Sequence, residues 1–250
     1  MAAKDGIVNI MKISVCIPMY NEGKIIAKTA RTLNDYMAAN FEDYEVIFAD
    51  DGSTDGCADI VRDLGFDHIR VVGYPQNQGK GCAVRTAMLA AVGDVMLFTD
   101  ADLAYGTEVI KRLYQIFAEM PEVDLVIGSR NAGADGYEGY TFVRKLASKA
   151  YIQFLKLVGG LKNSDSQCGF KGFRVDAVRR IFPLCQENGF AFDFEILLIA
   201  QKLGLKIEEM PVKVINHGSS KVRVLRDTVR MLKALKGMKS RIKRMQITKD

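Results

Sequence analysis

Two carboxylates, Asp100 and Asp102, flank Ala101 directly after the apolar run Val95–Phe98. A short apolar run bounded by polar residues predicts a buried strand. Open α/β sheets bind ligands at the carboxyl ends of their strands. Hard divalent cations prefer carboxylate oxygens, and Mg²⁺ commonly shares its remaining positions with substrate phosphates. The pair therefore predicts a metal that bridges a diphosphate, while a turn with aspartate caps would use the same residues.

Polar residues also follow two earlier predicted strands. Residues 18–22 follow the strand at 13–17, which we expect to stop at Pro18, and residues 50–53 follow the strand at 44–49. Because the carboxyl ends of parallel strands share one edge, the three clusters should converge on one crevice. A single cluster fits ordinary turn chemistry. Three clusters together favour a ligand site.

The elements that must position these clusters alternate along the chain. Apolar residues repeat at helical spacing over residues 24–39, between the first two strands. The other predicted strands cover residues 69–72, 95–99, 124–128 and 206–215, and the other helices cover residues 54–64 (capped by Ser53 or Thr54), 79–91, 107–120, 141–158, 173–182 and 192–203. This order predicts an α/β fold with right-handed crossovers and a mostly parallel sheet flanked by helices.

Composition is typical of a globular protein, with 48% apolar and 26% charged residues. No apolar run reaches the roughly 18 residues of a membrane span. The N-terminus lacks the pattern of a signal peptide, and we expect residues 1–11 to be a loose extension. The five cysteines lack CxxC spacing, which favours reduced cytosolic thiols over disulfides or a zinc site.

Four motifs occur in an order and spacing that resemble a known family. They are Pro-Met-Tyr-Asn-Glu at 18–22, Asp-Asp-Gly-Ser-Thr-Asp-Gly at 50–56, Asn-Gln-Gly-Lys-Gly at 77–81 and Asp-Ala-Asp at 100–102. As a set they resemble the family 2 glycosyltransferases with the GT-A fold, over residues 12–220. Residues 166–171, 190–195 and 218–221 are similar to the enzymes that glycosylate polyprenyl phosphates, dolichyl-phosphate β-glucosyltransferases first and mannose synthases second.

The resemblance implies a nucleotide-sugar site. Asp51 would contact the base, and Asp100 and Asp102 would bind Mg²⁺ or Mn²⁺. Gly79 would let the backbone approach the donor, and Lys80 would add positive charge, unless it is a surface lysine. The full implied donor set is Pro18, Tyr20, Asn21, Glu22, Asp50, Asp51, Gly79, Lys80, Asp100, Ala101 and Asp102.

The resemblance also implies an acceptor site. Asp193 and Asp102 would be the catalytic residues, with Asp193 as general base for an alcohol acceptor. A phosphate acceptor is already anionic, and Asp193 would then only orient groups. The residues implied to bind the acceptor or its phosphate are Arg130, Arg144, Gln167, Glu195 and Lys221. Exposed helix-start cations, and for Glu195 a first-turn acid, remain the alternatives. Cys168 is expected to be a packed thiol.

The tail at residues 221–250 carries a net charge of +9, whereas the preceding 220 residues carry −4. Its apolar residues recur every three to four positions, which predicts a basic amphipathic helix. Such a helix is typical of a membrane surface. Packing on the main domain is one alternative. Nucleic-acid binding is another, but the tail lacks the aromatics that would stack on bases.

Together these implications predict an inverting, metal-dependent glycosyltransferase, peripheral on the cytoplasmic membrane face. It would move a hexose, with glucose from UDP-glucose favoured, onto a polyprenyl phosphate, and it would bind no nucleic acid. The alternatives are a mannosyltransferase that uses GDP-mannose, an enzyme that acts on a glycan or glycolipid hydroxyl, and a silent nucleotide-binding membrane scaffold.

Overall fold

The computed structural model describes residues 11–131, 164–215, 235 and 237–245. In this part of the chain one sheet holds seven strands: β1 (Ile13–Met19), β2 (Tyr44–Asp51), β3 (Ile69–Tyr74), β4 (Val95–Phe98), β5 (Leu125–Ser129), β6 (Lys171–Arg174) and β7 (Ile207–Pro211). The helices are α1 (Ile26–Asn40), α2 (Cys57–Asp63), α3 (Lys80–Ala90), α4 (Glu108–Glu119), α6 (Val175–Ile181), α7 (Phe192–Lys202) and the short 3₁₀ helix η1 (Phe182–Leu184). A further helical stretch lies at residues 237–244 and is called the C-terminal helix below.

The strand order is β3-β2-β1-β4-β6-β5-β7, and the predicted mostly parallel sheet is confirmed. The exception is β6, which runs antiparallel to both β4 and β5. The sequence prediction of one helix over residues 173–182 is wrong at its start, because residues 171–174 form β6. Four residues are too few to display a period of two, and the adjoining α6 hides the boundary.

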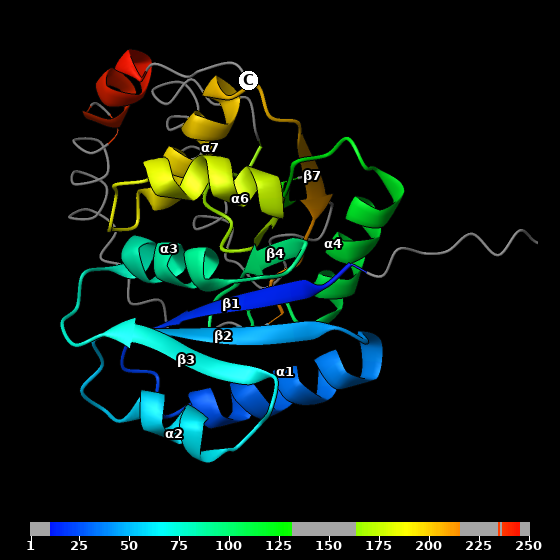
Figure 1. Ribbon diagram of the computed structural model, residues 1–250, viewed down its shortest axis with the longest axis vertical. Coiled ribbons are helices and arrows are strands. Elements are labelled where there is room, and N and C mark those ends of the chain that lie inside the picture. Colours follow the sequence, from blue (N-terminus) through cyan, green and yellow to red (C-terminus); the bar gives the residue numbers. More distant parts are fainter. Residues whose placement is uncertain (1–10, 132–163, 216–234, 236, 246–250) are drawn as a thin grey trace, which may run out of the picture.

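Helices cover both faces of the sheet, as Figure 1 shows. Side chains alternate between the faces along each strand. Cys16 of β1 packs with α3, α6 and α7. Its neighbours Val15 and Ile17 pack with α1, α2 and α4 on the other face. The result is a three-layer α/β/α arrangement with two apolar cores.

Strand β1 continues through Pro18, where we expected it to stop. The backbone carbonyl of Cys16 accepts a hydrogen bond from the N–H of Thr99 at 3.1 Å, so the backbone polar groups of Cys16 point toward β4. The backbone nitrogen of Pro18, two residues further along, points the same way, but Pro18 lies beyond the end of the pairing with β4, whose last paired residue is Phe98. No ladder partner needs its missing N–H there, so the proline is tolerated.

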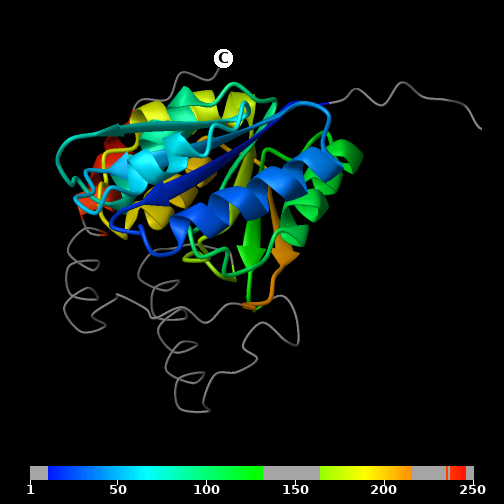
Figure 2. The ribbon, with the colours of Figure 1, turned by 90° about the horizontal axis from the view of Figure 1, so that it is seen from below.

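The C-terminal helix packs its apolar side on the domain. Leu235 just before it, and Met238 and Ile242 within it, are buried in the core that α3, α6 and α7 share. The packing alternative therefore holds for this part of the tail. Figures 1 and 2 both place this helix, in red, at the end of the molecule toward which β1 points.

No helix among the described residues has the length and apolar character needed to cross a bilayer. All five cysteines fall in the described part, where each is a buried free thiol. The helix predicted at 141–158 lies outside the described residues, and the domain boundaries at 12–220 and 221–250 stay predictions.

Candidate active site

Backbone and side-chain hydrogen bonds join the ends of β1 and β2. Asn21 N donates to Ser53 Oγ at 3.0 Å, and Asn21 Oδ1 accepts from Thr54 N at 2.9 Å. Gly23 N donates to Asp55 Oδ2 at 2.7 Å. Asn21 has a φ of 52°, a left-handed conformation that asparagine tolerates better than most residues. The first two predicted clusters therefore form one rigid corner.

This corner changes the predicted cap of α2. Neither Ser53 nor Thr54 caps the helix, because α2 starts at Cys57 with Gly56 as the N-cap residue. Ser53 is used instead to hold Asn21. Beside the corner, Tyr20 is 43% exposed, so it is accessible to a ligand.

Asp51, at the end of β2, is 3% exposed and accepts hydrogen bonds from four residues. Oδ1 accepts from Tyr74 Oη at 2.7 Å and from Gln78 N at 2.8 Å. Asn77 Nδ2 donates to Oδ2 at 2.8 Å, and Gly79 N donates at 3.0 Å. Asp51 therefore holds the loop before α3. The predicted contact with a base is untested, and its oxygens already have these partners.

Asp50 is the more open of the two acids, and Pro18 and Glu22 flank it. Asp50 is half-buried, and its Oδ1 accepts one hydrogen bond from Ser53 N at 3.0 Å. Pro18 is buried in β1, whereas Glu22 is half-buried near the charge of Asp102. All of these residues lie at the same sheet edge, as the sequence predicted.

A tight turn presents the two acids after β4. Leu103 N donates to the carbonyl of Asp100 at 3.0 Å, and Leu103 has a φ of 48°. Thr29 Oγ1 of α1 donates to the carbonyl of Ala101 at 2.6 Å, which fixes the turn to the helix layer. Burial and the neighbouring charge of Asp100 raise the pKa of Asp102. Two carboxylates are thus held together against their mutual repulsion.

Lys80, the first residue of α3, forms an ion pair with Asp100 Oδ1 at 2.5 Å. Its Nζ also lies 5.9 Å from the ring centroid of Phe192. Burial lowers the pKa of Lys80, but Asp100 and Asp193 raise it, and the net direction is upward. The lysine is therefore a fixed cation of the site, and the surface alternative is wrong.

The acidic pair fits a divalent cation. Two carboxylates that repel each other gain from a positive charge between them, and a hard cation takes oxygen ligands. The described residues hold no cluster of three or more possible protein ligands. A cation bound here would need further oxygens from a ligand, as a metal that bridges a diphosphate does.

The motif at residues 166–171 lies directly against this pair. A Cβ on Gly169 would lie 2.4 Å from Asp100 Oδ2, so only glycine allows this approach. Gly169 N donates to Tyr105 Oη at 3.3 Å. Gln167 is half-buried in the same turn. Burial raises the pKa of the Cys168 thiol to about 11, in agreement with the predicted packed thiol.

Asp193 forms an ion pair that the sequence did not reveal. Its Oδ1 lies 2.5 Å from Nζ of Lys171, a fully buried lysine in β6. Lys171 also donates to the carbonyl of Cys168 at 2.6 Å. Burial raises the pKa of Asp193, although the charges of Lys171 and Lys80 oppose that shift. The sequence signals for Lys171 were its apolar surroundings and its place at the end of the motif at 166–171, but its partner is 22 residues away.

Arg130, after β5, is paired within the protein. Nε and Nη2 donate to the two oxygens of Asp165 at 2.7 and 2.9 Å. Burial lowers the pKa of Arg130, but the hydrogen bonds and negative charge of Asp165 raise it by more, so the net direction is upward. Arg130 therefore stays a cation. The sequence predicted the arginine and missed the aspartate.

Glu195 is fully buried and faces the protein. Oε2 accepts from the backbone N–H groups of Gln186 and Glu187 at 2.9 and 2.7 Å, and Oε1 forms an ion pair with Arg241. Its contacts are thus structural, and the predicted acceptor role gains no support. Arg144 and Lys221 lie outside the described residues.

The glycines of the loop before α3 approach the chain itself. A Cβ on Gly79 would lie 2.4 Å from the carbonyl oxygen of Asn188, and one on Gly81 would lie 2.5 Å from that of Glu187. Both glycines are therefore required for close packing on residues 187–189. That Gly79 also lets the backbone approach the donor stays a prediction.

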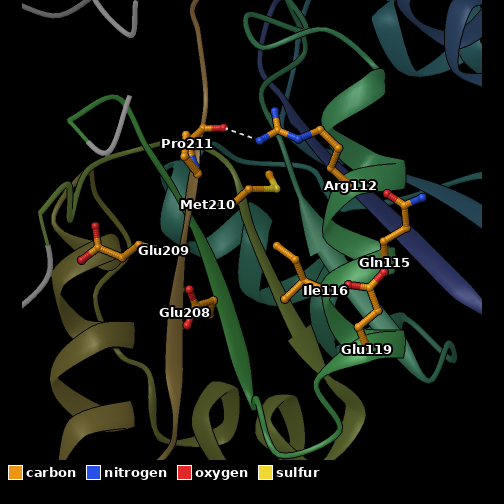
Figure 3. A pocket seen from close by; sticks show the side chains of 8 residues that line it. All are labelled: Arg112, Gln115, Ile116, Glu119, Glu208, Glu209, Met210 and Pro211. Atoms are coloured by element: carbon orange, nitrogen blue, oxygen red, sulfur yellow. Dashed lines mark hydrogen bonds between the residues drawn. The ribbon is translucent and has the colours of Figure 1, made fainter. Parts of the chain in front are cut away.

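A separate hollow lies between α4 and β7, as Figure 3 shows. Arg112 in its wall donates to the carbonyl of Pro211 at 3.0 Å. Its lining residues are Arg112, Gln115, Ile116, Glu119, Glu208, Glu209, Met210 and Pro211. None of these belongs to the predicted site.

A mostly parallel sheet with a carboxylate pair and a cation at the carboxyl ends of its strands is typical of α/β enzymes that bind nucleotides. The family model "Glycosyl transferase family 2" matches residues 14–182. The chain belongs to this family and is a glycosyltransferase.

Curated relatives carry a more specific name. The chain is 33% identical over 83% of its length to "Dolichyl-phosphate beta-glucosyltransferase ALG5C" of Trichomonas vaginalis, and it spans 65% of that protein. It is 31% identical to the dolichyl-phosphate beta-glucosyltransferase of Saccharomyces cerevisiae over 89% of its length, and 33% identical to that of Dictyostelium discoideum over 88%. It spans 72% of each of these two proteins.

Solved structures confirm the fold. Glucosyl-3-phosphoglycerate synthase from Mycobacterium tuberculosis, in complex with Mn²⁺, UDP and glucosyl-3-phosphoglycerate, matches with a TM-score of 0.67 at 19% identity, over 95% of this chain and 82% of that chain. The same enzyme is also known with Mg²⁺ and UDP. The predicted GT-A fold is thereby confirmed.

Proposed function

We propose that this chain transfers a hexose, glucose from UDP-glucose, to the phosphate of a polyprenyl phosphate with inversion at the anomeric carbon. The relatives named above supply the substrate class, since their names state a dolichyl-phosphate acceptor and a β-glucosyl product. The structural observation that carries the proposal is the contact between Gly169 and Asp100. It joins the motif that resembles these enzymes to the acids that face the donor.

On the donor side, Asp100 and Asp102 would hold Mg²⁺ or Mn²⁺. When bound, the metal offsets negative charge on the departing nucleoside diphosphate. Lys80 already lies against Asp100, so it is placed to contact the same phosphates. Its amino group adds a fixed positive charge where negative charge develops, which is the usual form of electrostatic catalysis.

On the acceptor side, the ion pair between Lys171 and Asp193 favours a phosphate. Protonation of Asp193 would leave the buried charge of Lys171 without its partner, and that is costly. Asp193 is therefore better suited to remain an anion that orients its neighbours. An anionic phosphate acceptor needs no proton removed before it attacks.

The direct test is to incubate the protein with Mn²⁺, labelled UDP-glucose and polyprenyl phosphate. We expect label in the organic phase, and its loss with Asp102→Asn. Absence of organic-phase label with UDP-glucose would overturn the proposal, and label with GDP-mannose alone would support the mannosyltransferase alternative. A thermal shift with Mn²⁺ and either UDP or GDP decides the base independently of any acceptor.

We further propose that the protein binds the cytoplasmic face of an anionic membrane peripherally. Three cations of the C-terminal helix, Lys239, Lys243 and Arg244, are exposed, whereas its apolar side chains are buried in the domain. For the described part of this helix, attraction would therefore be electrostatic, without insertion of its apolar side.

Vesicle sedimentation at low and high salt tests this attachment. Because deletion of the tail would also remove core contacts, the better variant is the triple Lys239→Gln, Lys243→Gln, Arg244→Gln. With each cation worth about 1 kcal/mol near an anionic leaflet, we expect binding to fall more than about tenfold. Binding that ignores salt, anionic lipid and the three substitutions would refute the proposal.

A further inference from the structure

A chain of contacts connects the C-terminal helix to the start of α3. Its first link is the ion pair between Arg241 and Glu195, whose carboxylate is fully buried at the start of α7. Arg241 Nη1 also donates to Oε1 of Gln186 at 2.9 Å. One guanidinium thus touches both a buried carboxylate and the loop that follows η1.

The second link is a pair of hydrogen bonds between Glu195 and that loop. Oε2 accepts from the backbone N–H groups of Gln186 at 2.9 Å and Glu187 at 2.7 Å. Hydrogen bonds from neutral donors to a buried carboxylate are among the stronger ones in proteins. Residues 185–189 are called the clamp loop below.

The third link is the contact between the clamp loop and α3. The carbonyl of Asn188 accepts from Gly81 N at 2.8 Å, and its side-chain Oδ1 accepts from Arg85 Nη2 at 2.8 Å. There is no room for a Cβ on Gly81, which would lie 2.5 Å from the carbonyl oxygen of Glu187. The clamp loop therefore packs backbone to backbone on the residues next to Lys80.

We propose that Arg241 is a positioning residue for the donor site. Its ion pair with Glu195 fixes the clamp loop, and the clamp loop fixes the first turn of α3. That turn carries Lys80, whose ammonium group lies 2.5 Å from Asp100. A residue of the C-terminal helix thus sets the place of a cation beside the donor phosphates. The UDP-binding experiment for this proposal rests on the proposed function, whereas the amide-exchange experiment does not.

Amide hydrogen exchange tests the structural link without any substrate. In Arg241→Gln we expect exchange at Gln186, Glu187 and Gly81 to rise at least about tenfold, since Glu195 loses the ion pair that holds it against the clamp loop and the other two links depend on that position. The matched control is Lys243→Gln, which removes one charge from an exposed position of the same helix. Exchange at these three amides should stay unchanged in the control.

Glu195→Gln gives a second route if Arg241→Gln is too unstable. It keeps an acceptor for the clamp-loop amides and removes the charge that Arg241 faces. Because both variants break the same link, their effects on exchange at Gly81 should not add in the double variant. Additive effects, or faster exchange confined to residues 237–245, would overturn the proposal.

The functional readout is affinity for UDP with Mn²⁺, measured well below the melting temperature of each variant. We expect Arg241→Gln to weaken it several-fold, Arg241→Lys to restore part of the loss, and Lys243→Gln to leave it unchanged. Wild-type affinity in Arg241→Gln would overturn the positioning role. Failure of the wild-type protein to bind UDP would overturn the proposed function, and amide exchange would then still decide the role of Arg241.

Discussion

At the scale of single residues, the site is a set of ion pairs in which buried or half-buried cations hold buried acids in place. Lys171 pairs with Asp193, and Arg130 pairs with Asp165. Each pair takes one predicted site residue, Asp193 or Arg130, and adds a partner that was not among the predicted site residues. Breaking such a pair costs more than removing both charges, because one charge is then left buried. Two predictions follow from this asymmetry.

Asp193→Asn should lower the free energy of unfolding by about 3 kcal/mol or more, because it strands the charge of Lys171. The double variant Asp193→Asn, Lys171→Met should recover most of that loss. With a phosphate acceptor, the double variant should keep its rate within about tenfold of wild type, whereas loss of a general base costs 10²–10⁴-fold. Urea unfolding and transfer rates measure both. A thousandfold loss of rate in a stable double variant would instead support a hydroxyl acceptor.

The lowered pKa of Asp165 predicts how the stability of the fold changes at acidic pH. Burial alone would raise the pKa of Asp165, but its hydrogen bonds with Arg130 hold the pKa below the ordinary value. A lowered folded pKa contributes stability that is fully present above about pH 4, the unfolded value, and that is lost as the pH falls toward the folded value.

We therefore expect thermal stability to fall more steeply as the pH drops below about 4 in the wild type than in Asp165→Asn, which should be less stable at pH 7. Melting temperatures across this range supply the measurement. Parallel profiles for the two proteins would show that the pKa of Asp165 is the same in the folded and unfolded states.

At the scale of elements, turns and short strands place the site by close backbone approach. Gly169 brings the turn before β6 against Asp100, and the glycines at the start of α3 bring that helix against the clamp loop. In each place the missing Cβ decides how near two elements lie. Strand β6 matters for the same reason, since its antiparallel course carries Lys171 into the middle of the sheet.

Gly169→Ala should weaken UDP binding in the presence of Mn²⁺ by more than about tenfold, because an added methyl would overlap Asp100 and move one of the two carboxylates proposed to hold the metal. Gly237→Ala is the control, since a Cβ there meets nothing within 4 Å. Isothermal titration of both variants checks the expectation. Equal UDP affinities of the two variants would show that the turn at Gly169 adjusts to the added methyl group without moving Asp100.

At the scale of the whole molecule, the described part of the basic tail is both packed into the core and charged on its surface. Its buried apolar residues join the same apolar cluster as α3, α6 and α7. The exposed cations lie on the outer side of the same helix. The C-terminal helix is therefore expected to contribute to stability and to membrane attraction through different side chains.

Ile242→Ala should lower the free energy of unfolding by about 2–4 kcal/mol, the usual cost of truncating a buried aliphatic side chain. Lys243→Ala, its exposed neighbour, should change it by less than about 0.5 kcal/mol. Chemical denaturation separates the two. A small effect of Ile242→Ala would mean that the helix does not pack on the domain in solution.

The sequence by itself determined the alternation of strands and helices, the parallel sheet edge and the acids that lie there. These follow from local periodicity and from the chemistry of short motifs, which act over a few residues. Tyr20, Asp50, Asp100 and Asp102 could be placed at the crevice on that basis alone.

Only the tertiary structure decided what those residues contact. The partners Lys171 and Asp193 are 22 residues apart, Arg130 and Asp165 are 35 apart, and Arg241 reaches Glu195 from another helix. Such pairings depend on how elements pack across the sheet, and no local pattern encodes them. For the same reason the apolar side of the C-terminal helix, which as a pattern suits a membrane as well as a core, is assigned to the core by its packing in the cluster of α3, α6 and α7.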